Sequence, residues 1–82
     1  MKKYEDKSNI TGKIIKEERI KQNLSKSEVC RKLQFYAVYI DNTELHRMET
    51  GKMIIKDFEL IALCKVLNID YKKIDAAIVQ EE

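Results

Sequence analysis

LSKSEVCRKLQFYAVYIDNTELHRMETGK, residues 24–52, contains two helix starts and one helix stop. Ser25 and Glu28 have the spacing of a capping box, in which the serine hydroxyl accepts from the glutamate amide and the carboxylate reaches back. Asp41 and Glu44 repeat this spacing, and Gly51 can end the second helix in a left-handed conformation. The stretch therefore predicts two short helices, at about 26–33 and 42–49.

The second of these helices has about two turns, too few to be stable through backbone propensity alone. At 100° per residue, Leu45, Met48 and Glu49 fall on one side of it, and we expect that side to pack. Polar side chains fall on the other side, and these are Asn42, Thr43, His46 and Arg47. The helix thus combines a packing side with a compact set of hydrogen-bonding groups.

This polar side has the chemistry of a DNA reader. Asn and Arg have the bidentate geometry that recognises adenine and guanine in the major groove. A helix N-terminus also favours phosphate. A solvated helix face explains the same residues, and for the helix taken alone that is the commoner situation.

Three further helices are predicted by apolar spacing, over about 11–22, over 57–67 and from Asp70 onward. Thr11 is expected to cap the first of them, and Asn23 and Asn68 suit left-handed helix ends. Met53-Ile54-Ile55 is too short to count as a strand. The fold class is therefore all-α, with five short helices.

Length and composition predict one small domain. The chain has 82 residues, of which 44% are hydrophobic and 37% charged, as in a globular protein. No apolar run is long enough to span a bilayer, and none follows the lysines of MKKYEDKSN as in a secretory signal. We expect a domain at 11–79, a partly flexible N-terminal arm at 1–10, a tail at 80–82 and a cytoplasmic location without membrane contact.

Charge is distributed unevenly along the chain. Residues 1–34 hold ten Lys/Arg against five Asp/Glu, whereas residues 57–82 hold three against six. An excess of basic residues in this N-terminal segment indicates a negatively charged partner. Ordinary solvated helix faces explain the same distribution equally well.

The residues most often used in catalysis form no recognisable pattern. Cys30 and Cys64 lack metal or redox spacing and are expected to fill the core rather than form a disulfide. His46 has no acid or thiol partner at a usable spacing, and no metal cluster or glycine-rich phosphate loop is found. We expect no enzymatic activity, no cofactor, no metal and no small-molecule substrate.

A capped helix, a connection and a second short helix with a polar outer side form the layout of helix-turn-helix recognition. Over about residues 11–75 the sequence resembles the phage-repressor-like (XRE, Cro/C1-type) helix-turn-helix domains. The most specific part is Arg-x-Glu-x-Gly-Lys at 47–52, coupled to Leu-Ser-x-x-Glu at 24–28. Similar residues stand at Gly12, Ile15, Lys16, Arg19, Val29, Cys30, Leu33, Leu60, Cys64, Leu67 and Ile74. The resemblance implies a compact five-helix lambda-repressor-like domain.

The resemblance also implies site residues. It implies a partly buried ion pair between Arg19, in the first helix, and Glu49, at the end of the second helix of the motif. The family's base-contacting positions correspond here to Asn42, Thr43, His46 and Arg47. Its phosphate-contacting positions correspond to Lys26, Lys52 and, more weakly, Lys16.

The connection between the two helices of the motif departs from the common pattern. Gln34 to Ile40 is seven residues long, whereas a tight turn has three or four. We expect its apolar residues, Phe35, Val38 and Ile40, to fold under the following helix. Tyr36 and Tyr39 are expected at the surface, where a lid over the core is favoured over a contact with DNA or protein.

These features predict a bacterial or phage transcription regulator, expected to be a repressor, that binds a specific double-stranded DNA operator. A homodimer is expected, with Ile74, Ile78 and Val79 as its surface. The alternative is a protein-interaction module on the same fold, an antitoxin-like or antirepressor-type binder with a protein partner and little DNA affinity. The two hypotheses differ in salt dependence, because phosphate contacts are far more salt-sensitive than apolar ones.

Overall fold

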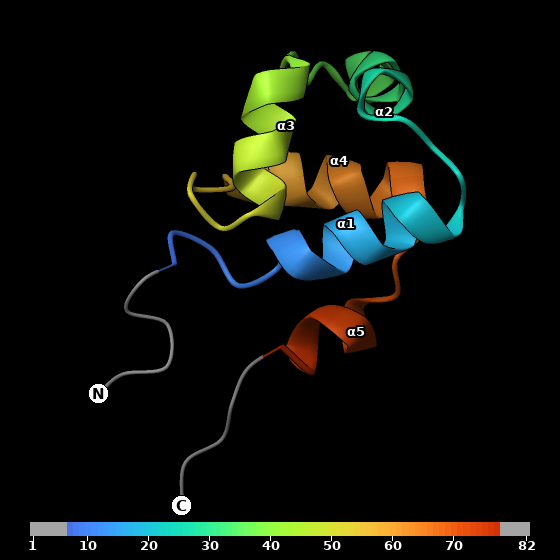
Figure 1. The fold of residues 1–82 in the computed structure, drawn as a ribbon. Coiled ribbons are helices and arrows are strands. Elements are labelled where there is room, and N and C mark those ends of the chain that lie inside the picture. The colour runs from blue at the N-terminus through green and yellow to red at the C-terminus, as the bar shows by residue number, and fades with distance from the viewer. Residues whose placement is uncertain (1–6, 78–82) are drawn as a thin grey trace, which may run out of the picture.

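The computed structural model describes residues 7–77, and in this part of the chain every regular element is helical. The helices are α1 (Gly12–Lys21), α2 (Lys26–Leu33), a single 3-10 turn η1 (Gln34–Tyr36), α3 (Asn42–Glu49), α4 (Asp57–Leu67) and α5 (Tyr71–Asp75). Figure 1 shows α2 and α3 on one side of α1 and α4, with α5 on the other side. Helices α2 and α3 pack against each other, and α4 contacts α1 and α2. The fold is the all-α five-helix architecture that the sequence predicts.

Both capping boxes are present and fix the starts of α2 and α3. The Glu28 amide donates to Ser25 Oγ at 3.1 Å, and the Ser25 amide donates to Glu28 Oε1 at 3.0 Å. At α3 the Glu44 amide donates to Asp41 Oδ1 at 2.7 Å, and the Asp41 amide donates to Glu44 Oε1 at 3.1 Å. Glu44 is therefore occupied at the helix start, as its place in the box predicts.

Left-handed residues end three of the helices, as expected. Asn23, Gly51 and Asn68 have φ angles of 58°, 77° and 55°. After α3 the Lys52 amide donates to the carbonyl of Arg47 at 2.8 Å, and the Gly51 amide donates to that of Met48 at 3.2 Å. These two bonds satisfy two of the last carbonyls of α3 and turn the chain away from its axis.

The start of α1 differs from the expectation. Thr11 occupies the capping position and is buried, but its side chain makes no capping bond. Asn9 does this instead: its Oδ1 accepts from the Gly12 amide at 2.7 Å. Its Nδ2 donates to the carbonyls of Met48 and Met53 at 2.9 and 2.8 Å. Asn9 thus joins the start of α1 to the end of α3 and to the loop that follows it.

A single core lies between the first four helices. Its fully buried side chains are Ile15, Val29, Leu33, Leu45, Met48, Leu63 and Leu67. Cys30 is buried and Cys64 half-buried, both are free, and burial raises the pKa of both thiols. This environment fits the core-filling role expected of the two cysteines.

The connection after α2 buries less than expected. Val38 is buried and Ile40 half-buried, but Phe35 is 86% exposed, so the prediction that Phe35 folds under α3 is wrong. The reason is local: η1 buries none of its residues, and the left-handed Ala37, with a φ of 59°, ends this turn before Val38. Only the residues after Ala37 can enter the core.

The two tyrosines of the connection lie at the surface, as expected, and neither packs into the core. Tyr36 is 47% exposed and Tyr39 73% exposed. Tyr36 lies instead against the surface of α4, where Lys65 Nζ is 5.8 Å from its ring centroid. Phe58 and Ile61, beside the apolar stripe of α4, are likewise more than half exposed.

Replacing Gly12 with alanine is expected to destabilise the protein by about 1–3 kcal/mol, the range seen when a packed site is overfilled. Gly12 is buried, and a Cβ there would overlap the carbonyl oxygen of Met48. Because that oxygen belongs to the backbone of α3, a side-chain rotation cannot relieve the overlap. Urea unfolding followed by circular dichroism measures the change. Lys13→Ala, at the exposed next position, should change stability by less than about 0.5 kcal/mol.

Candidate nucleic-acid interface

The candidate interface is built on α3, whose two sides differ sharply in burial. Leu45 and Met48 are fully buried and Glu49 is 5% exposed. The residues expected to contact bases, Asn42, Thr43, His46 and Arg47, are all exposed. The structure therefore gathers these four side chains on the exposed side of α3. The buried side of the same helix packs against the core.

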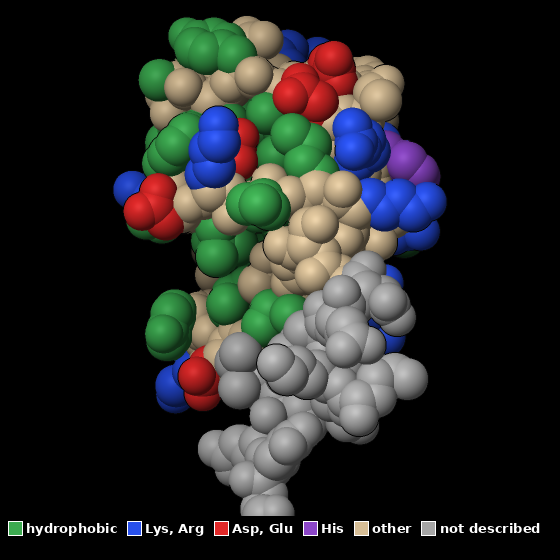
Figure 2. All heavy atoms as spheres, turned by 90° about the vertical axis from the view of Figure 1, so that its left-hand side faces the viewer, with side chains coloured by type: hydrophobic (Ala, Val, Ile, Leu, Met, Phe, Trp, Pro, Cys, Tyr) green, Lys and Arg blue, Asp and Glu red, His purple; other side chains and the backbone are tan. Residues whose placement is uncertain are grey.

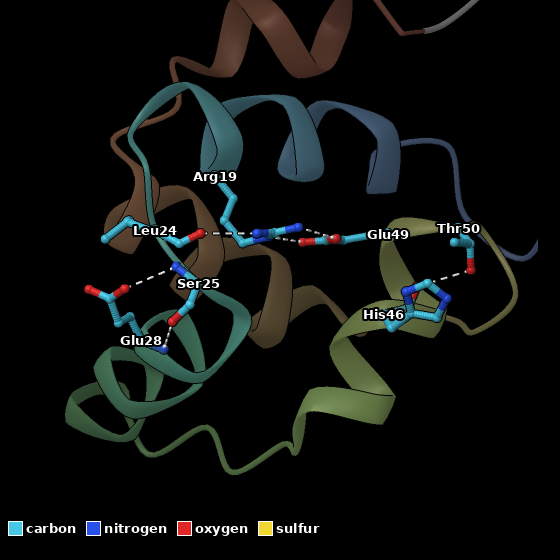
Figure 3. Close-up of polar contacts among 7 residues, drawn as sticks. All are labelled: Arg19, Leu24, Ser25, Glu28, His46, Glu49 and Thr50. Atoms are coloured by element: carbon cyan, nitrogen blue, oxygen red, sulfur yellow. Dashed lines mark hydrogen bonds and ion pairs between the residues drawn. The ribbon is translucent and has the colours of Figure 1, made fainter.

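The exposed side of α3 carries basic groups. Figure 2 shows the single histidine at the right-hand edge of this view, with Lys and Arg side chains next to it, while hydrophobic side chains gather toward the left-hand edge. Thr50 does not add to the outward groups, because its Oγ1 donates to the carbonyls of His46 and Arg47 at 3.0 and 3.3 Å. It instead satisfies the last turn of α3, as Figure 3 shows for His46.

Arg19 and Glu49 anchor the end of α3 to α1. Arg19 Nε donates to Glu49 Oε2 at 2.7 Å, and Nη2 donates to Oε1 at 3.1 Å. Nη1 donates to the Leu24 carbonyl at 3.0 Å, so the guanidinium lies between that carbonyl and the carboxylate (Figure 3). The two side chains are 10% and 1% exposed. The bond to Glu49 raises the pKa of Arg19, outweighing the opposing effect of burial.

The lysines expected to contact phosphate lie at three different places. Lys52 is exposed directly after α3, and Lys26 is half-buried at the first position of α2. Lys16 is exposed on α1, a separate helix, and it remains the weakest candidate of the three. Of the three, Lys52 lies nearest in the chain to the helix that carries the base-contact candidates, in the turn that follows it.

Two residues beside the candidate interface were not predicted from the sequence. Ser27 of α2 accepts a hydrogen bond at 2.8 Å from Asn42 Nδ2. Lys7 lies against Gly51, and the Ser8 amide donates to the Gly51 carbonyl at 2.8 Å, which brings a cation beside the loop of Lys52. Both contacts join segments at least 15 residues apart, and no local pattern in the sequence signals them.

The expected dimer surface is described only in part. Ile74 is half-buried and packs against the core from α5, because that short helix covers the edge of the core rather than standing free. Ile78 and Val79 lie outside the described residues. The structure therefore assigns Ile74 a packing contact within its own chain.

A compact bundle of five helices, with two capped helices in sequence and an exposed polar side on the second, defines a helix-turn-helix protein. Residues 15–74 match the model of the family described as helix-turn-helix, of the XRE type. Because the match covers more than half of the chain, the protein belongs to this family. It is therefore a DNA-binding helix-turn-helix protein of the kind that regulates transcription.

Other comparisons add no relatives: no curated protein and no solved structure was found to match the chain. Within residues 7–77 no helix is long and apolar enough to cross a membrane. The same residues contain no group of three His, Cys, Asp or Glu side chains placed to hold a metal ion.

Proposed function

We propose that the protein is a sequence-specific double-stranded DNA-binding regulator, acting as a repressor, that reads the major groove with α3. One observation supports this most directly: four hydrogen-bonding side chains project from a two-turn helix whose opposite side is fully buried. A helix held in this way presents its side chains as a rigid unit. The major groove is wide enough to admit a helix, and base edges there distinguish all four base pairs.

In this proposal the side chains divide into readers and anchors. Asn42, Thr43, His46 and Arg47 contact base edges. Lys26 and Lys52, with Lys16 as the weaker third, contact phosphates and set the position of α3 along the duplex. Phosphate contacts add affinity without sequence preference, whereas base contacts add preference.

Selecting binding sites from a random duplex library tests this division. Thr43→Ala is expected to relax preference at one or two base positions by about 1–3 kcal/mol. Lys52→Ala is expected to weaken binding to all sequences alike, since it removes a phosphate contact. Both residues are exposed, so neither change should disturb folding.

The two variants serve as controls for each other. If Thr43→Ala and Lys52→Ala changed the selected sequences in the same way, the division into readers and anchors would be wrong. Failure of the wild-type protein to enrich any sequence would remove the proposed function itself.

We further propose that the protein binds as a homodimer. Helix-turn-helix readers of this size bind two half-sites about 34 Å apart, one turn of DNA. The segment from Ile74 through Ile78 and Val79 is the proposed contact. Analytical ultracentrifugation showing a monomer at high micromolar concentration, both alone and with a duplex carrying two half-sites, would contradict this part of the proposal.

A second candidate function, protein interaction, is favoured by the exposed apolar side of α4. Two hollows of about 210 and 310 Å³ share Ile61 and Lys65, and Tyr36, Phe58 and Tyr71 line them. Lys65 lines both hollows and offers a cation to a partner seated there. The surface therefore suits an apolar partner segment carrying a carboxylate. Two results together would favour this candidate: the protein selects no duplex from the library, and it binds a partner protein that the Lys65→Glu variant no longer binds.

A further inference from the structure

The two helices of the motif are joined at the candidate DNA surface by a hydrogen bond between side chains. Asn42 Nδ2 donates to Ser27 Oγ at 2.8 Å. Asn42 is the first residue of α3 and Ser27 the second of α2, and both are exposed. An exposed asparagine would ordinarily move between several rotamers, so this bond selects one of them.

The atoms that this bond leaves free are those that recognise adenine. A primary amide has two N–H donors and a carbonyl oxygen that accepts. The bond to Ser27 uses one N–H of Asn42, so the second N–H and Oδ1 remain free. This pair of groups, a donor beside an acceptor, matches N7 and the N6 amino group of adenine in the major groove.

The positions of both partners are fixed by the helix starts. The Ser25–Glu28 box sets the first turn of α2, and the Asp41–Glu44 box sets the first turn of α3. The spacing between Ser27 and Asn42 therefore follows from backbone elements rather than from a flexible loop. Ordering a side chain before binding lowers the conformational entropy that binding must remove.

We infer that Ser27 is a positioning residue that determines specificity: it orients the amide of Asn42 to read an adenine of the operator. This inference rests on the proposed function, since it concerns how the reading helix of that proposal discriminates bases. Ser27 makes no base contact in this scheme. It acts through Asn42, and therefore at the single base position that Asn42 reads.

The test is a binding-site selection with the wild-type protein, Ser27→Ala, Ser27→Thr, Asn42→Ala and the double Ala variant. Ser27→Ala is expected to lower the preference for adenine at one position by about two- to tenfold, the contribution of one hydrogen bond. Asn42→Ala should remove the preference at that same position. In the Asn42→Ala background, Ser27→Ala should have no further effect on it, because the two side chains act together.

Ser27→Thr is the matched control, because it keeps a hydroxyl at the same position and should retain most of the adenine preference. If the wild-type protein selects a sequence and Ser27→Ala selects it equally well, the inference is overturned while the proposed function stands. A uniform loss of affinity in Ser27→Ala, without a change of preference, would also overturn it, since that result indicates a phosphate contact. If the wild-type protein selects nothing, the proposed function fails and this inference fails with it.

Discussion

Glu49→Ala is expected to lower the free energy of unfolding by about 3–5 kcal/mol, as does removal of one partner from a buried ion pair. The variant leaves the Arg19 guanidinium, whose side chain is 10% exposed, without its carboxylate. Two of the donors of Arg19 then lose their acceptors inside the protein. Urea denaturation monitored by circular dichroism measures the loss. A domain of this length has a stability of about 4–12 kcal/mol, so the expected loss is a large part of the whole.

The expected loss of stability comes mainly from leaving one charge buried without its partner, and only in small part from the net stabilisation that the intact ion pair provides. Replacing both partners by apolar residues of similar volume, Arg19→Met with Glu49→Leu, should cost less than the sum of the two single changes, since no charge stays buried alone. This double variant also keeps the test informative if Glu49→Ala fails to fold.

A matched control is the ion pair between Lys73 and Glu18, whose lysine side chain is 52% exposed. Lys73→Ala should cost clearly less than Glu49→Ala, because the lysine is half exposed and water reaches this pair, although the Glu18 side chain is only 12% exposed. If Glu49→Ala cost as little as Lys73→Ala, the pair between Arg19 and Glu49 would not anchor α3 energetically.

Local signals in the sequence were sufficient to predict the elements of the fold. Two capping boxes and three left-handed residues mark helix ends because each depends on residues within about one turn of each other. The outward set on α3 follows from helical spacing in the same way, once Leu45 and Met48 are recognised as its packing side. Both kinds of inference need no knowledge of the rest of the chain.

Contacts between distant segments could not be predicted in this way. Asn9 bonds to Met48 and Met53, which are 39 and 44 residues away, and an asparagine there has no local signature of that role. In the connection after α2, local sequence likewise did not predict which apolar residues are buried. Hydrophobicity placed Phe35 and Val38 together in the core, but the left-handed Ala37 separates them, and only Val38 is buried.

The proposed mode of binding also predicts a steep dependence on salt. Each phosphate neutralised by a lysine releases condensed counterions, so the logarithm of the affinity falls with the logarithm of salt concentration by about 0.9 per contact. Lys16, Lys26 and Lys52 from each of two copies would make six such contacts. The affinity for a full operator should therefore fall about a thousandfold between 50 and 200 mM salt.

The same measurement distinguishes a dimer from a monomer on DNA. Three contacts from a single copy would give a fall of only about fortyfold over this range. Lys52→Ala should lower the slope by about 1.8 if two copies bind and by about 0.9 if one does. Thr43→Ala should leave the slope unchanged, because Thr43 carries no charge. Fluorescence anisotropy titrations at four or more salt concentrations give these slopes, and a slope near zero with undiminished affinity would exclude binding through the phosphates.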